Sequence, residues 1–248
     1  MFEQHLPGYI EAFKTAPWIV RESPHYRSHY VAGSLAEKEI DYIVETQEKA
    51  CVDILDFLNL PAPERSISYY FYPDADTKKR LMGNPWFAQS VYADFAVHAL
   101  YTEEHRIIGP HEDMHLLSLP LGLAVGFIQE GLAERMVGHD WFGNSFTGTV
   151  REAMSDQHFT FSPDLLVSHQ AWLDTPDDFA RQYYALAALF SDYLITRFGK
   201  EAYFKFYTAL QRGATPDENG WQYESVLGIG PDALFTDFKS SLATGSAT

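Results

Sequence analysis

The chain has 248 residues, of which 46% are hydrophobic and 15% aromatic, and a formal net charge of −16 at pH 7. That length and composition allow a sizeable core in one large domain or in two closely packed halves. The acidic excess argues against nucleic acid or an anionic membrane as a partner, because both are bound by clustered Lys and Arg.

The lack of a membrane span and of a secretory signal, together with a single cysteine, further narrows the class of protein. No run of about 18 apolar residues is present, so no membrane span is expected. The first residues lack the basic and apolar segments of a secretory signal, so we expect a cytoplasmic enzyme. The single cysteine, Cys51, excludes an intrachain disulfide and lies in an apolar helical pattern, as a core residue does.

The first half of the chain alternates strand and helix patterns. Runs of β-branched and aromatic residues predict strands, and apolar residues at helical spacing predict helices. In chain order we expect a short helix and an extended entry within 1–24, a strand at 26–31, a long helix at 35–58, a strand at 67–72, a short helix at 75–82 and one or two strands or a hairpin at 89–101. Ser34 and Glu37 have the spacing of a capping box at the start of the long helix.

Helical patterns dominate the second half. Proline suits the first turn of a helix, so a helix is expected to begin at Pro110. The later expected elements are helices at 127–137, 183–198, 201–211 and 231–242, with irregular segments and short helices between 139 and 180.

Strands followed by helices predict the α+β class, with a small N-terminal sheet and a long helix, then a mainly helical half. We expect a single domain over 1–242, made of an α/β half (1–118) and a helical half (119–242), followed by a disordered tail at 243–248.

The segment His111-Glu112-Asp113-Met114-His115 is an H-E-x-x-H sequence. On a helix, His111 and His115 lie one turn apart on the same face, where two imidazoles can bind one zinc ion. Glu112 is then placed to act as general base on a water at the metal. A motif this short arises by chance in some chains, so the prediction depends on a third ligand.

Glu130, in the segment Gln129-Glu130-Gly131-Leu132-Ala133-Glu134, is the candidate third ligand. The intervening residues are enough to finish one helix, turn, and begin an antiparallel second helix. Gly131 is expected to let this helix approach the first closely. Glu134, one turn beyond Glu130, is expected to accept a hydrogen bond from a ligand histidine.

With these motifs the chain resembles the gluzincin metallopeptidases, in particular the bacterial peptidase-MA-like group, in which H-E-x-x-H is followed by E-G-x-A-E. The resemblance extends over most of the chain through individually weak elements, namely SPHYRSHYVAGS with the long helix after it, ISYYFYPD, the segment from Tyr184 to Leu194 with Arg197-Phe198-Gly199, and the segment from Val226 to Phe238. It implies a zincin-like fold with the active-site helix between the two halves, and one zinc ion held by His111, His115 and Glu130.

The resemblance also implies roles for residues outside the ligand set. Glu112 would act as base and acid, and Tyr184 would help bind the oxyanion, although an ordinary aromatic residue on a buried helix face explains Tyr184 equally well. Glu134 falls where such enzymes place a carboxylate behind the metal ligands. Arg135 departs from the family, which often has Tyr at that position, so the family's substrate contacts there do not carry over; Arg135 and His139 are candidates for substrate contact or proton donation. No G-x-M-E-N stretch of the aminopeptidase branch is present.

The expected function is that of a zinc metallopeptidase, acting on a peptide or a small amide-containing substrate. A zinc enzyme of the same fold acting on a non-peptide small molecule is the main alternative, and a non-catalytic binding scaffold is disfavoured by the intact Glu112. His139 is a candidate proton donor. The remaining histidines singled out for the cleft are more often surface or core residues, and they are His98, His105, His158 and His169.

Overall fold

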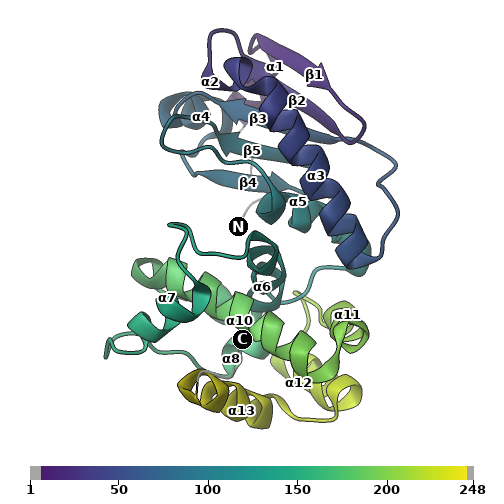
Figure 1. The fold of residues 1–248 in the computed structure, drawn as a ribbon, viewed down its shortest axis with the longest axis vertical. Helices are drawn as coiled ribbons and strands as arrows, with labels where there is room; N and C mark the ends of the chain where they lie inside the picture. Colours follow the sequence, from purple (N-terminus) through teal and green to yellow (C-terminus); the bar gives the residue numbers. More distant parts are fainter. Residues whose placement is uncertain (1–6, 245–248) are drawn as a thin grey trace. The chain divides into compact units, whose positions relative to one another are not determined.

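The computed structural model describes residues 7–244 of the chain. The chain forms two compact units that divide between Leu117 and Ser118, and each is described by itself (Figure 1). The expected α+β class is confirmed, because the first unit contains a mixed sheet and the second is helical. The expectation of a single zincin-like domain over 1–242 stays a prediction.

The first unit is built on a five-stranded sheet with the order β1-β2-β3-β5-β4. The central strands β2, β3 and β5 are parallel, and the two edge strands pair antiparallel with their neighbours. The strands are β1 (Trp18–Glu22), β2 (Tyr26–Val31), β3 (Ile67–Tyr72), β4 (Ala88–Val91) and β5 (Ala96–Leu100). The predicted strands at 26–31 and 67–72 and the hairpin within 89–101 are confirmed, and the extended entry near the start is the edge strand β1.

Helices cover both faces of this sheet (Figure 1). α3 (Ile40–Leu58) and α5 (Pro110–Leu117) contact each other and one face of the sheet, where Tyr26 and Tyr69 are fully buried. α1 (Pro7–Lys14) and α4 (Ala75–Met82) contact each other at the opposite face. There Tyr72 and Leu100 pack with Leu81 of α4 and with Phe13 of α1. Because side chains alternate along a strand, α5 and α4 contact different residues of the same strands.

The helix predicted at 35–58 is interrupted, and this part of the prediction is wrong. α2 (Leu35–Lys38) and α3 are separate because Glu39 leaves helical geometry, with φ −109° and ψ 16°. Its carboxylate is bound by Arg106 at 3.0 Å and by the Tyr101 hydroxyl at 2.7 Å. Ser34 caps α2 as expected, but the Glu37 carboxylate accepts from the Gly33 amide instead of closing the capping box on Ser34.

Lys78 of α4 is fully buried, and its ammonium donates to Asn84 Oδ1 at 3.1 Å. Burial lowers the pKa of Lys78 to about 8. Between this pH and the ordinary lysine pKa of about 10.4 the unfolded chain holds more protons than the folded one, so stability rises with pH across that window.

We expect Lys78→Met to remove this rise. As the pH rises from 8 to 10.5, the free energy of unfolding of the wild type should rise by about 3 kcal/mol relative to that of the variant, at about 1.4 kcal/mol per pKa unit. Denaturant unfolding at several pH values measures the difference, and Lys79→Met removes an exposed neighbour as the control. Parallel stability curves for Lys78→Met and the wild type would contradict the prediction.

The second unit is helical and centres on α10 (Ala180–Phe198), which contacts α6, α7 and α11. The other helices, besides three short turns of 3₁₀- or π-helix, are α6 (Gly126–Val137), α7 (Phe146–Ala153), α8 (Asp164–Val167), α9 (His169–Leu173), α11 (Lys200–Ala209), α12 (Pro216–Gln222) and α13 (Pro231–Thr244). The predicted helices are confirmed to within a few residues, whereas α12 was not predicted.

The C-terminal end of the second unit corrects one expectation. Residues 243 and 244 belong to α13, so the disordered tail cannot begin at 243, and 245–248 lie outside the described residues. Across residues 7–244, no helix has both the length and the apolar character that a membrane span requires.

Candidate functional site

The two histidines of the H-E-x-x-H segment lie together on α5, as predicted. Their Nε2 atoms are 3.2 Å apart, and the two rings meet edge to face with centroids 4.9 Å apart. A tetrahedral zinc ion with Zn–N bonds of about 2.0–2.1 Å keeps two nitrogen ligands about 3.3 Å apart. His111 and His115 therefore fit one metal ion. A hydrogen bond between the rings has a similar length, and metal analysis distinguishes the two states.

The start of α5 follows from its local sequence. Gly109 has φ 102°, a backbone conformation that strongly favours glycine, and Pro110 occupies the first turn. The helix then buries Asp113 and Met114 against the rest of the first unit. These positions leave His111 and Glu112 partly exposed.

Asp113 ties α5 to the sheet. Its Oδ2 atom accepts a hydrogen bond of 2.8 Å from the hydroxyl of Tyr26 on β2. Burial raises the pKa of Asp113 to about 8, the neighbouring Glu112 adds to the rise, and the Tyr26 hydrogen bond opposes it. The contact fixes the face of α5 that points into the unit, and therefore the face that carries the two histidines.

Glu112 is held by a residue that the sequence analysis missed. Ser90 on β4 places its Oγ 2.5 Å from Glu112 Oε2 and 3.1 Å from the Glu112 carbonyl oxygen. A hydroxyl donating to one carboxylate oxygen leaves the other oxygen available to a water molecule. Nothing local marks Ser90, because it lies 22 residues from Glu112 in sequence and meets it only through the pairing of β4 in the sheet.

If Glu112 is the general base that the sequence predicts, Ser90→Ala should lower kcat by about 10-fold, the effect of losing one charge-assisted hydrogen bond of roughly 1.5 kcal/mol that holds Glu112 in place. Metal content should not change, because Ser90 contacts Glu112, the predicted base, and not the predicted histidine ligands. Steady-state kinetics with metal analysis measures both quantities, and Ser90→Thr, which keeps the hydroxyl, serves as the matched control. A kcat equal to that of the wild type in Ser90→Ala would show that the contact does not orient the base.

Glu130 and Glu134 lie on α6 in the second unit. Glu130 is partly exposed, whereas Glu134 is buried at 3% exposure. Their pairing with the histidines of α5 stays a prediction.

Gly131 packs against α10 in the structure, and its expected close approach to α5 stays a prediction. A Cβ at Gly131 would lie 2.3 Å from the carbonyl oxygen of Ala187 and 2.6 Å from Ser191 Oγ. The helix that approaches this glycine closely is thus α10, since both neighbours lie on it. Gly131 orients α6, and with it Glu130, by letting α6 pack directly on α10.

The other predicted residues of the second unit make contacts within that unit. Arg135 donates from Nε to Asp192 Oδ1 at 2.6 Å and so links α6 to α10. His139 is exposed, and its Nδ1 lies 2.8 Å from the Asp140 carbonyl oxygen. Tyr184 on α10 packs against two indole rings, with centroids 5.5 Å away at Trp141 and 5.1 Å away at Trp172. Contacts of these three residues with a substrate stay predictions.

The remaining histidines fall into different environments. His98 is buried at 3% exposure and stacks on Tyr70, at the sheet face opposite α5. His105 packs on Phe87, and His158 is exposed. His169 lies in the second unit, where it is electrostatically coupled to Glu130.

Two further residues, Arg212 and His169, lie against α6, and the sequence did not predict that they would lie there together. Arg212 donates to the side-chain oxygen of Gln129, the residue before Glu130. His169 Nδ1 accepts from the Gly126 amide at 3.1 Å. Burial lowers the pKa of His169 to about 4, the charge of Arg212 adds to the fall, and Glu130 opposes it. No local pattern in the sequence indicates that the loop of Arg212 and the start of α9, which carries His169, lie against α6.

Comparison with known proteins adds no family assignment. No protein-family model matches the sequence, and the search of curated proteins found no match. The resemblance to gluzincins therefore depends on the motifs and on the site geometry described above.

Proposed function

We propose that this protein is a zinc-dependent metallohydrolase, of the gluzincin peptidase type, that cleaves an amide bond. The observation that carries the proposal is the arrangement on α5. Two imidazole nitrogens lie 3.2 Å apart, and the carboxylate of Glu112, the residue after the first histidine, is held by Ser90. Both features are those that a zinc hydrolase requires of its two histidine ligands and its general base.

The proposed ligand set is His111 and His115 of α5 and Glu130 of α6, with one donor atom from each residue. Two neutral imidazoles and one carboxylate are a typical donor set for catalytic zinc, which keeps a fourth position open. Glu134 is proposed to accept a hydrogen bond from one of the ligand histidines and so to fix its tautomer.

When bound, zinc would supply a Lewis acid and lower the pKa of a bound water toward about 7. Glu112 accepts a proton from the attacking water and later delivers it to the leaving amine, so that an amide and water become a carboxylic acid and an amine. Ser90 holds one carboxylate oxygen of Glu112 during these transfers. Tyr184 is proposed to donate a hydrogen bond to the oxyanion of the tetrahedral intermediate.

Metal analysis of the purified protein tests the proposal directly. We expect about one zinc per chain in the wild type and a loss of most of it in His111→Ala, because two ligands rarely retain catalytic zinc. His158→Ala, which removes an exposed histidine, is the matched control and should keep the metal.

Turnover is measured on a peptide library and on a pool of small amides, with the protein stripped by chelator and then reloaded. Hydrolysis should disappear with the metal and return with zinc. A wild-type protein that binds no zinc after exposure to it would overturn the proposed function.

A further inference from the structure

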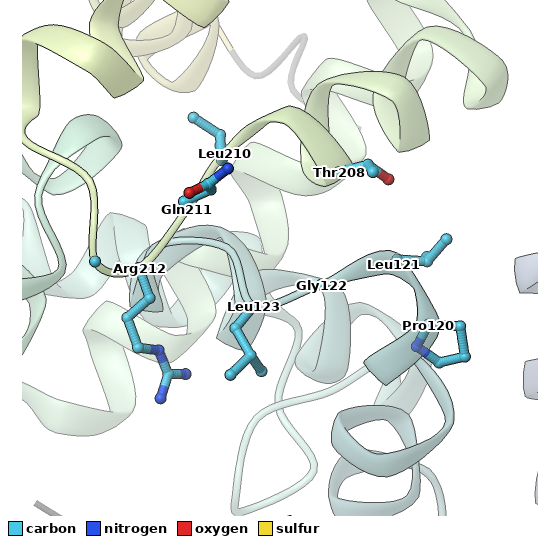
Figure 2. A pocket seen from close by; sticks show the side chains of 9 residues that line it. Pro120, Leu121, Gly122, Leu123, Thr208, Leu210, Gln211 and Arg212 are labelled. Carbon is cyan, nitrogen blue, oxygen red and sulfur yellow. The ribbon is translucent and has the colours of Figure 1, made fainter.

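Arg212 lies in a short loop of the second unit whose backbone is fixed on both sides. Its amide donates to the Leu123 carbonyl oxygen at 2.8 Å. Asn219 holds the backbone of Gln211, accepting from the amide and donating to the carbonyl oxygen at 3.0 Å each. Figure 2 shows the side chains of Arg212 and Leu123 extending side by side from these two segments. The backbone position of Arg212 is therefore set by contacts within the second unit.

The guanidinium is only partly used within the protein. It donates to Gln129 Oε1, but its Nε is buried and has no hydrogen-bond partner within the described part of the chain. A buried donor without a partner costs free energy, so such a donor usually has a ligand or water in the working protein.

Arg212 also differs from comparable arginines of the same unit in lacking a carboxylate. Arg135 and Arg181, whose side chains are 26% and 21% exposed, form ion pairs with Asp192 and Asp140. Arg212 is partly buried too, yet no ion pair with an Asp or Glu is found for it among residues 7–244. The exception is notable in a chain with 34 acidic residues and 18 Lys and Arg residues.

The groups around Arg212 leave its positive charge available. His169 is the nearby titratable group on α9, and it is neutral at pH 7 because its pKa is lowered to about 4. Glu130 follows Gln129 on α6, and in the proposed function its charge is directed to the metal.

Space for an anion borders the residue. An open surface depression of about 550 Å³ lies between the segments 120–123 and 208–213, and Arg212 is one of its lining residues (Figure 2). Cavities of about 300–1,000 Å³ accommodate small ligands. Arg212 therefore borders a surface that solutes can reach.

We propose that Arg212 binds a carboxylate of the substrate, so that the amide cleaved at this site belongs to a compound with a free acid group close to the scissile bond. The inference rests on the proposed function for the cleavage itself. Its own basis is the partly buried guanidinium, anchored on the residue before Glu130, with an unpaired Nε and no internal carboxylate. Guanidinium is suited to this task because its planar N–H groups bind a carboxylate through two parallel hydrogen bonds.

Binding to the metal-free protein tests the assignment without any turnover. N-acetylphenylalanine, which has a free carboxylate, and N-acetylphenylalaninamide, which has none, are titrated into chelator-treated protein. The dissociation constants are measured by calorimetry, and the ¹⁵N resonance of the Arg212 Nε–H group reports contact at the residue. We expect the acid to bind at least about 10-fold more tightly than the amide, as the loss of a hydrogen bond to a charged group implies.

Variants show whether the preference for the acid depends on Arg212 or on positive charge in general. Arg212→Gln should remove the preference for the acid, whereas Arg212→Lys, which keeps the charge without the planar fork, should keep part of it. Arg151→Gln removes an exposed arginine of the same unit and should leave the preference unchanged. Unfolding curves of each variant show that it is folded before binding is compared.

Three results would overturn the inference. They are equal affinity for acid and amide, an acid preference that survives in Arg212→Gln, and tighter binding of inorganic phosphate than of the carboxylate at Arg212. None of these outcomes bears on zinc content or hydrolysis, so failure of this inference and failure of the proposed function are distinguishable.

Discussion

Glu112→Gln should lower kcat by about 10²–10⁴-fold, the contribution typical of a general acid–base residue. The amide side chain has the shape of the carboxylate but cannot accept the proton of the attacking water. The Ser90 hydroxyl, which lies 2.5 Å from Glu112 Oε2, can still donate to the amide oxygen, so the local structure should persist.

Metal content shows whether a loss of activity in Glu112→Gln comes from loss of the base or from loss of the metal. Zinc should remain near one per chain in Glu112→Gln, because Glu112 is the base and not a ligand in the proposed site. Glu104→Gln, an exposed substitution in the same unit, should change neither kcat nor zinc. A Glu112→Gln variant with wild-type turnover would assign the general base to another residue. Loss of zinc together with activity would instead indicate that Glu112 ligates the metal.

Gly131→Ala should strongly destabilise the second unit, although alanine is the better helix former. The added Cβ would lie 2.3 Å from the Ala187 carbonyl oxygen, a backbone atom that cannot move without displacing α10. Overpacking of this kind costs about 1–3 kcal/mol, which for a chain of this size lowers Tm by about 2–4 °C per kcal/mol. Zinc affinity should fall as well, because α6 carries the proposed ligand Glu130.

Gly220→Ala is the matched control in the same unit. Gly220 lies in α12, and a Cβ there would meet its nearest neighbour, Pro231 Cγ, at 3.9 Å. With space available and helical geometry, the substitution should be neutral or stabilising by up to about 1 kcal/mol. Thermal unfolding of both variants measures the contrast. Equal Tm values for Gly131→Ala and Gly220→Ala would show that α6 and α10 have room to separate.

The residues that sequence reasoning located best are those whose signal is local. Pro110 and the H-E-x-x-H spacing predicted a helix with two histidines on one face, and α5 has this arrangement. Strands 26–31 and 67–72 were equally clear, because their aromatic and β-branched residues have no competing helical periodicity. The helix at 35–58 failed at one residue, because the ion pair of Glu39 with Arg106 acts over 67 positions in sequence.

The sequence and the tertiary structure determine different parts of the candidate site. The sequence alone predicts the ligand types, the base and the α+β class, because helix spacing and side-chain chemistry are local properties. Only the tertiary structure places Ser90 on Glu112, Gly131 against α10, and Arg212 beside Gln129. These contacts join residues that are distant in the chain, and their formation depends on how strands pair and helices pack, which no local pattern records.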